Sequence, residues 1–320
     1  MTEDVPAAPE PQRLRLSRID FSKWGPFVAL VLMCIVAAVA SPYFLTPKNL
    51  LNVSRQVAQN GIVSVGMTFV ILTAGIDLSV GSVIALASTL AALSKGMGVW
   101  SLVIPLAAGV LVGLINGTLI TSLRAQPFVI TLGIMVAVRG VALTISGGHR
   151  IEGINPMFRF MGVGQVAGVP VQSLLFFGVA LAGIFILHRT TFGRAVYSVG
   201  ANEKAARLSG ILTVKTKIIV YAISGLLAAF VGTIVSSHLN VGDSAFHGLN
   251  AELDAIAAVT LGGVALSGGR GTVVGAIAGA FLIGLITNIL NLRNVPGDVQ
   301  LIAKGAIILG AVAIQQLRQR

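Results

Sequence analysis

The stretch that decides the fold is residues 189–217, which read RTTFGRAVYSVGANEKAARLSGILTVKTK. It is a long polar segment between two apolar runs, and its basic residues are balanced by a single acid, Glu203. The apolar runs on either side indicate a chain that crosses a membrane. Lys and Arg near the ends of membrane spans stay on the cytoplasmic side. The stretch therefore predicts a cytoplasmic loop of a membrane protein.

The middle of this loop has the pattern of a short polar helix. Asn202 is a favoured N-cap residue, and Gly210 stands where a helix should end. The residues between them are mostly good helix formers: Glu203, Lys204, Ala205, Ala206, Arg207, Leu208 and Ser209. We expect this helix to lie at the cytoplasmic face, where it suits the docking of a soluble partner.

The composition extends this prediction to the whole chain. Of 320 residues 55% are hydrophobic and only 10% are charged, whereas about a quarter of a soluble domain is charged. We therefore expect an all-α membrane protein of about ten transmembrane helices, within a range of eight to eleven, with both termini cytoplasmic. The expected spans are 26–45, 61–75, 78–94, 100–122, 127–146, 171–187, 218–236, 255–266, 272–292 and 299–315.

The remaining segments follow from the same pattern. Residues 1–22 are expected to be a disordered cytoplasmic tail, 23–316 the transmembrane domain, and 317–320 a short cytoplasmic tail. The glycine-rich loop 147–169 is expected outside. Most Lys and Arg fall in loops expected inside, so the net charge of +11 indicates orientation rather than nucleic-acid binding.

Glycines interrupt the apolar sequence at two similar places, LTAGIDLSVGSV at 72–83 and ALSGGRGTVVGA at 265–276. Such breaks in two parts of a transporter point to the conducting region; the alternative is two tight hairpins between packed helices. Glycines also recur at four-residue spacing at 109, 113 and 117 and at 271, 275 and 279. These stripes indicate close helix packing, within the chain or between two copies.

The motifs of enzyme chemistry are absent from the sequence. There is no G-x-x-x-x-G-K-[ST] loop for ATP, no G-x-S-x-G nucleophile turn, and no metal-like spacing of the four His. We expect no catalytic residue, no cofactor and no metal on this chain.

The segment GANEKAARLSGI at 200–211 resembles the cytoplasmic coupling segment of ABC-importer permeases, in particular the ribose-type sugar permeases of the branched-chain amino acid/ribose-type family. Two further stretches fit the same family in the same order: TFVILTAGIDLSVGSVIAL at 68–86 and LDAIAAVTLGGVALSGGRGTVVGAIAGAFLIG at 253–284. The resemblance runs from about residue 49 to near the C-terminus and leaves out the first 45 or so residues.

The resemblance implies a multi-pass permease of the bacterial cytoplasmic membrane and a set of partners. They are a second permease copy, a cytoplasmic ATPase that holds ATP and Mg, and a periplasmic or extracytoplasmic sugar-binding protein, with membrane lipid around the spans. The coupling residues would be Asn202, Glu203, Lys204, Ala205, Arg207, Leu208, Ser209 and Gly210.

Candidates for the pathway or its gate follow from the chemistry of sugars, which are uncharged and rich in hydroxyl groups. Amides, hydroxyls and aromatic faces suit them, and the candidates are Asn60, Asp77, Ser79, Asn116, Gln126, Phe128 and Asn288. The alternative for each amide is a hydrogen bond between helices. Asp77 is either a pathway or gate carboxylate or an N-cap, a role that Ser79 could share.

Arg139 and Lys304 are the cations expected at membrane depth, either snorkelling or paired with a carboxylate. Three other functions stay open. The alternatives are a permease for branched-chain amino acids or nucleosides, a secondary carrier that works without ATP, and a scaffold without transport. The shortage of intramembrane acids argues against an ion-driven carrier.

Overall fold

The computed structural model describes the backbone of residues 21–319 and the side chains of residues 25–307, 309 and 310. The predicted tail at 1–22 lies outside this range except for Phe21 and Ser22, which begin the first helix. At the other end the last helix runs to Gln319, through most of the predicted tail at 317–320.

Among the described residues ten helices form the bundle, and each overlaps one predicted span: α1 (Phe21–Ala40), α2 (Pro47–Leu72), α3 (Val80–Leu93), α4 (Trp100–Leu123), α5 (Pro127–Ser146), α7 (Val171–Arg189), α10 (Thr213–Leu239), α11 (Ala251–Leu261), α12 (Val273–Leu292) and α13 (Gly297–Gln319). The eighth expected span, 255–266, is wrong at its end, because α11 stops at Leu261. Within the described residues, five of them are long and apolar enough to cross a membrane: α4, α5, α7, α10 and α12. Residues 25–40 and helix α3 are shorter apolar helices. The predicted helical, polytopic architecture is confirmed at this level.

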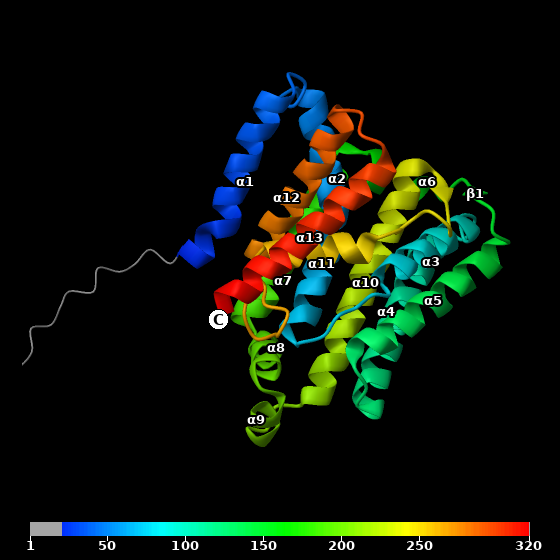
Figure 1. The fold of residues 1–320 in the computed structure, drawn as a ribbon. Coiled ribbons are helices and arrows are strands. Elements are labelled where there is room, and N and C mark those ends of the chain that lie inside the picture. The colour runs from blue at the N-terminus through cyan, green and yellow to red at the C-terminus, as the bar shows by residue number, and fades with distance from the viewer. Residues whose placement is uncertain (1–20, 320) are drawn as a thin grey trace, which may run out of the picture.

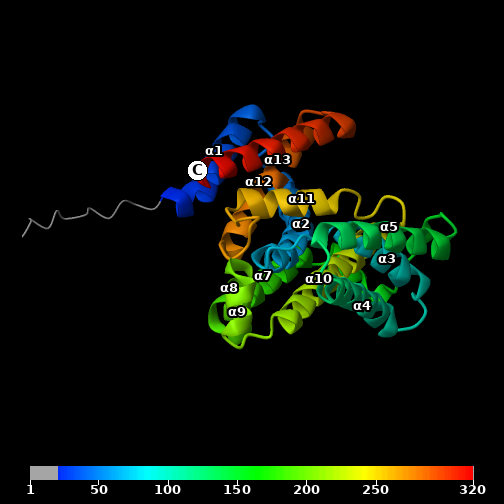
Figure 2. The same ribbon diagram turned by 60° about the horizontal axis from the view of Figure 1, so that its bottom comes forward.

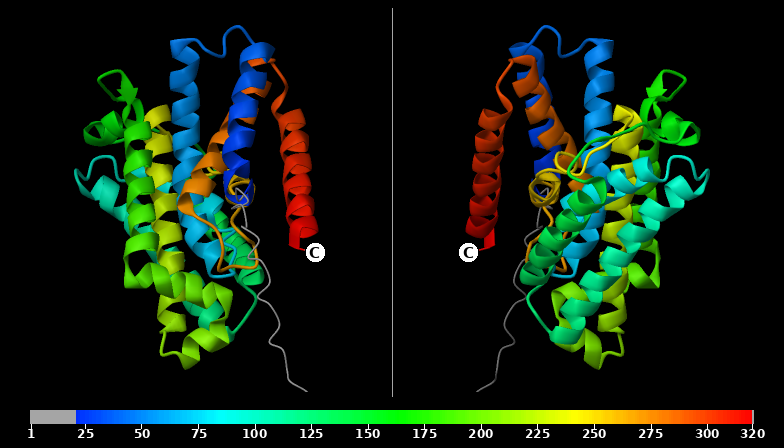
Figure 3. Two further views of the ribbon diagram at one scale, coloured as in Figure 1. Left: turned by 90° about the vertical axis from the view of Figure 1, so that its left-hand side faces the viewer. Right: turned by 90° about the vertical axis from the view of Figure 1, so that its right-hand side faces the viewer.

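Helix α2 is the centre of the bundle (Figure 2). It packs against α7, α10, α11 and α12, and every residue from 61 to 72 is buried. Helices α3, α4 and α5 lie on one side of it, and α1, α12 and α13 lie on the other (Figures 1 and 3). A helix surrounded in this way must be apolar or internally hydrogen-bonded on all faces.

Helix α2 begins earlier than predicted. Residues 49–60 are polar and were expected before the span, but α2 starts at Pro47, with the Thr46 hydroxyl accepting the Asn49 N–H at 3.4 Å. The expected start at residue 61 is therefore wrong. The polar residues are accommodated because several of them find partners inside the bundle, which hydropathy alone does not reveal.

The loops at the two ends of the bundle differ in structure. At one end lie α8 (Thr191–Ala201) and α9 (Glu203–Leu208), and both described ends of the chain point toward it (Figure 1). At the other end, loop 147–169 contains helix α6 (Pro156–Val163) and two-residue antiparallel strands that the sequence did not predict. Strand β1 (Ile151–Glu152) pairs with β4 (Val241–Gly242), and β2 (Gln165–Val166) pairs with β3 (Val169–Pro170).

Glycines let α4 and α10 approach closely. A Cβ atom added at Gly113 would lie 2.7 Å from the Ala222 Cα, and one at Gly117 would lie 2.6 Å from the Ile218 Cα. Gly279 brings α12 close to the backbone of α11 at Ala258, and Gly275 lies against Gly262, directly after the end of α11. The packing prediction for the glycine stripes is confirmed within the chain, except that position 271 lies in the loop before α12.

We expect Gly113→Val to destabilise the protein strongly. The new side chain would overlap backbone atoms of α10, which cannot move aside as a side chain can, and overpacking of this kind costs about 1–3 kcal/mol or more. Thermal unfolding in detergent should show a lower midpoint. The control is Gly133→Val on α5, where an added Cβ atom meets nothing within 4 Å. Equal unfolding midpoints for the two variants would contradict this account of the helix contact.

Candidate functional site

The short helix predicted in loop 189–217 is present as α9. The Asn202 Oδ1 atom accepts the Ala205 N–H at 3.0 Å, so Asn202 caps the helix as predicted. Gly210 follows with φ +80°, the left-handed conformation that favours glycine after a helix. Ser209 occupies the C-cap position between them.

An ion-pair network braces α9. Glu203 faces Arg207 one turn later, with 3.6 Å between Oε1 and Nη2, which confirms the predicted brace. The other carboxylate oxygen of Glu203 accepts a hydrogen bond from Lys217 Nζ at 2.5 Å. Because Lys217 belongs to α10, the network ties the small helix to a long helix of the bundle.

The outward face of α9 is exposed. The Leu208 side chain is 90% exposed, and Lys204, Ala205, Arg207 and Ser209 are also exposed. A groove of about 990 Å³ runs beside this face, between α9, the turn from α4 to α5, and the start of α10. The predicted Gln126 lines this groove rather than the interior of the bundle. Because the Leu208 side chain is 90% exposed, it adds little to the packing of the described bundle and is accessible to a partner.

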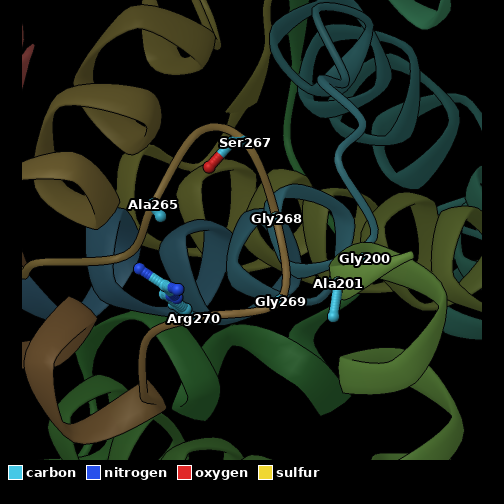
Figure 4. Close-up of a pocket in the computed structure, with 7 residues that line it drawn as sticks. All are labelled: Gly200, Ala201, Ala265, Ser267, Gly268, Gly269 and Arg270. Atoms are coloured by element: carbon cyan, nitrogen blue, oxygen red, sulfur yellow. The ribbon is translucent and has the colours of Figure 1, made fainter. Parts of the chain in front are cut away.

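Helix α8 connects this segment to the interior. At Gly200 the backbone passes so close to the Leu72 carbonyl, at the end of α2, that no Cβ atom would fit. The Gly269 N–H donates to the same carbonyl at 2.9 Å. Gly200 and Ala201 lie beside the loop from Ala265 to Arg270 (Figure 4), and residues of both segments line a cavity of about 550 Å³.

The two glycine-interrupted breaks predicted from the sequence therefore meet in space. One is loop 73–79 between α2 and α3, and the other is loop 262–272 between α11 and α12. A Cβ atom at Gly268 would lie 2.8 Å from the Ala74 N atom, so the loops are in direct contact. The Tyr197 hydroxyl on α8 also donates to the Gly271 carbonyl at 2.8 Å. We call this three-way contact of α8 with the two breaks the junction.

Asp77 lies in the first break and is buried in a polar cluster. Its Oδ1 atom accepts the Ser79 hydroxyl at 2.6 Å and the Ser79 N–H at 3.0 Å, and its Oδ2 atom accepts the Ser224 hydroxyl at 2.8 Å. Asn116 Nδ2 donates to the Ser79 hydroxyl at 2.8 Å. The carboxylate thus joins α3, α4 and α10. Ser79, the residue before α3, makes no capping bond with its own side chain. The Asp77 carboxylate accepts the Ser79 N–H at the start of this helix, which is the bond of a capping side chain and agrees with the cap alternative.

We expect Asp77→Asn to keep most of the stability and activity, and Asp77→Leu to lose both. Asparagine retains an oxygen for the Ser79 groups, and its amide can donate to the Ser224 hydroxyl. Leucine would leave buried donors unpaired, at about 1–3 kcal/mol each. Unfolding midpoints and transport measured together check this. Normal folding with abolished transport in Asp77→Asn would assign the carboxylate charge to the pathway or gate instead.

The other predicted residues are not brought together. Asn288 and Asn49 exchange two amide hydrogen bonds, of 2.8 and 3.1 Å, between α12 and α2. Phe128 is 49% exposed on the surface of α5. Of the two cations, Lys304 Nζ lies 2.8 Å from the Asp254 carboxylate, and Arg139 donates to carbonyl groups of the loop that follows α10.

Asn60 has a different environment, which the sequence did not reveal. It lines a cavity of about 260 Å³ together with Gln56, Phe246, His247 and Asp254. The signal for this cavity was present in the sequence as amides repeating at 52, 56, 59 and 60. It was missed because these residues were assigned to a loop, where amides are solvated and their helical spacing carries no meaning.

Comparison with known proteins agrees with this architecture. Residues 49–312 match a family model described as the permease component of branched-chain amino acid transport systems. The chain is 42% identical to the ribose import permease protein RbsC of Bacillus subtilis, over 92% of each chain. It is 35% identical to the xylose transport system permease protein XylH of Escherichia coli K12, over 87% of each chain. No solved structure matches.

These matches cover nearly all of the described bundle, including α9 and both breaks. The several apolar helices also agree with a protein embedded in the membrane. The chain therefore belongs to the permease-component family of branched-chain amino acid transport systems, as a multi-pass protein of the cytoplasmic membrane.

Proposed function

We propose that this chain is the membrane permease of an ATP-driven importer, which carries a monosaccharide such as ribose or a related pentose or hexose into the cell by alternating access. The names of its relatives, a ribose import permease and a xylose transport permease, support the substrate class. The observation that carries the proposal is the braced and exposed helix α9, whose Leu208 side chain is 90% exposed. A partner bound to α9 would be connected to the junction by α8, the helix that precedes α9 in the chain.

The proposed importer has several parts besides this chain. Two permease copies would form the membrane unit within the lipid, and a cytoplasmic ATPase would bind ATP and Mg²⁺ and dock on α9. An extracytoplasmic sugar-binding protein would deliver the substrate from the opposite end. The chain itself would be a transport subunit without catalytic residues, since its sequence has no phosphate-binding loop.

We also propose ten spans with both termini in the cytoplasm. In a Cys34→Ala background, a cysteine introduced by Ala205→Cys on α9 should react with an impermeant thiol reagent only from the cytoplasmic side. A cysteine introduced by Val166→Cys on the hairpin of β2 and β3 should react only from outside; both positions are exposed. Labelling of both cysteines from the same side would contradict the proposed topology.

Two other functions differ from this one in what they require. A permease for branched-chain amino acids, suggested by the description of the family, would need the same ATPase but a different binding protein. A secondary carrier would need no ATPase, and the exposed face of α9 would then have no role.

Reconstitution separates these possibilities. The permease is placed in proteoliposomes with its ATPase, its binding protein and internal ATP, and uptake of ribose, xylose, leucine and a nucleoside is compared. We expect ATP-dependent uptake of a monosaccharide and none by the permease alone. Uptake of leucine or a nucleoside but no sugar, or ATP-independent uptake by the lone chain, would contradict the proposal.

A further inference from the structure

We propose that the cavity beside Asn60 is a chamber that binds the sugar in transit, in the half of the bundle away from α9. This inference rests on the proposed function and names a site for its substrate. The chamber lies between α2, α3, α10, α11 and the loop at 243–250, and its volume is about 260 Å³. Pockets for small ligands begin at about 300 Å³, so the chamber suits a single sugar ring rather than an oligosaccharide.

Two amide side chains on α2 are available to a ligand. Gln56 and Asn60 line the chamber one helical turn apart, and neither side chain has a hydrogen bond with another described residue. Their neighbour Gln59 differs, because its amide donates to Gln172 Oε1 at 3.0 Å. Amides that face a cavity without internal partners can both donate to and accept from sugar hydroxyl groups.

A carboxylate completes the polar wall. The Asp254 Oδ2 atom accepts a hydrogen bond from Lys304 Nζ at 2.8 Å, which holds the side chain in place and balances its charge. No hydrogen bond from the described part of the chain reaches Oδ1, so this oxygen can accept one from a hydroxyl group. A zwitterionic amino acid needs a free carboxylate to pair with its ammonium group, but the Asp254 carboxylate is already paired with Lys304. An uncharged sugar needs no such partner.

Most of the rest of the lining is apolar and aromatic. Val63, Ile84 and Val231 belong to it, with Phe246 at the loop. Arg150 lies over the Phe246 ring, with its guanidinium carbon 5.4 Å from the ring centre, which restricts the ring's position. A sugar ring has C–H faces as well as hydroxyl edges, and aromatic side chains offer a matching apolar surface.

The loop at 243–250 forms one side of the chamber and is held at several points. Arg139 Nη1 on α5 donates to the Ser244 and His247 carbonyl groups at 2.8 and 3.0 Å. Asp243 pairs with Arg150 at 2.7 Å. Burial by itself raises the pKa of Asp243, but hydrogen bonds from the Phe246 and Ala245 N–H groups and from Arg150 outweigh it and leave that pKa below its ordinary value. The carboxylate is therefore ionised when it pins the loop.

The test uses the complete reconstituted importer. We expect Gln56→Leu and Asn60→Leu each to reduce sugar uptake per ATP hydrolysed by about tenfold, the effect of losing a hydrogen bond or two to the substrate. Asn60→Gln, which keeps the amide, should recover part of the activity. Asn52→Leu is the matched control, because Asn52 lies on the same helix but is exposed and outside the chamber.

A second measurement does not depend on rates of uptake. In the Cys34→Ala background, Asn60→Cys is labelled with a small thiol reagent during turnover, with and without a large excess of ribose or xylose. We expect the sugar to slow labelling at position 60 but not at position 52 after Asn52→Cys.

The outcomes distinguish a failure of the chamber proposal from a failure of the proposed function. Suppose that the unsubstituted importer takes up sugar, but both leucine variants match the control and sugar gives no protection at position 60. The proposal that the chamber binds sugar is then wrong, while the proposed function is still supported. If the unsubstituted importer takes up no sugar, the proposed function fails and the chamber fails with it. Partial recovery in Asn60→Gln together with protection at position 60 supports the chamber.

Discussion

Replacing Leu208 with aspartate is expected to abolish ATP-dependent uptake while leaving the bundle folded. Leu208 is 90% exposed on α9, so the protein's own core loses nothing when it changes. A partner that docks on α9 would bury this side chain, and a carboxylate in an apolar contact pays a desolvation cost. Small docking elements concentrate binding in a few side chains, so the loss should exceed about 1 kcal/mol and remove detectable coupling.

Two further variants test the same surface by disturbing α9 itself instead of its exposed side chain. Glu203→Arg would place a third cation beside Arg207 and Lys217 and break the brace that holds α9 on α10. Gly210→Val would put a β-branched residue at φ +80°, a conformation it strongly resists, and so disturb the end of the helix. Both should give the same loss of uptake as Leu208→Asp.

Co-purification with the ATPase and uptake into vesicles, with and without internal ATP, are the measurements. The control for co-purification with the ATPase is Val166→Asp, another exposed apolar residue changed to aspartate, but at the opposite end of the protein. Circular dichroism and unfolding midpoints should stay near the unsubstituted values for Leu208→Asp. Normal ATP-dependent uptake in Leu208→Asp, Glu203→Arg and Gly210→Val would remove the coupling role of α9.

The second large effect is expected at the junction. Gly200→Val should uncouple the importer: the ATPase should still bind, but uptake should fall to background. An added Cβ atom at Gly200 overlaps the Leu72 carbonyl, the same atom that accepts the Gly269 N–H. Because both partners are backbone, α8 must move away from the end of α2 and from loop 262–272. Movement at α9 would then no longer reach the two breaks.

The readouts for Gly200→Val are co-purification with the ATPase, ATP hydrolysis and uptake in the same proteoliposomes. Gly178→Val is the matched control, because an added Cβ atom on that part of α7 meets nothing within 4 Å. Retained binding with lost uptake distinguishes this variant from Leu208→Asp, in which binding is lost as well. Full uptake in Gly200→Val would show that the junction transmits nothing.

Much of the fold could be predicted because it depends on local sequence. Each span expected from hydropathy overlaps a helix, and the cap at Asn202, the helix end at Gly210 and the pair between Glu203 and Arg207 all follow from residues close in the chain. The α2 boundary was missed because hydropathy places polar residues in loops. A polar helix end inside a bundle is stable only when distant side chains satisfy it, as Asn288 does for Asn49.

The candidate site was predictable to a smaller extent, for the same reason. Asp77, Asn60, Asn116 and Asn288 looked alike as polar residues in apolar sequence. The side-chain partners of Asp77, Asn116 and Asn288 lie between about 40 and 240 positions away, except for the Ser79 groups beside Asp77, and Asn60 has no side-chain partner among the described residues. Only the packing places Asp77 and Asn116 in one buried cluster, Asn288 in a helix contact, and Asn60 at a cavity. Spacing along one chain does not distinguish these three environments.

The sequence by itself determined that this protein is a helical membrane protein with a short capped helix between two apolar helices, because membrane insertion and helix capping depend on neighbouring residues. The tertiary structure alone decided that the breaks at 73–79 and 262–272 meet beside Gly200, and that Gln56, Asn60, Asp254 and Phe246 surround one cavity. Both features are contacts between segments far apart in the chain. They exist only once the helices pack around α2 (Figures 1 and 2).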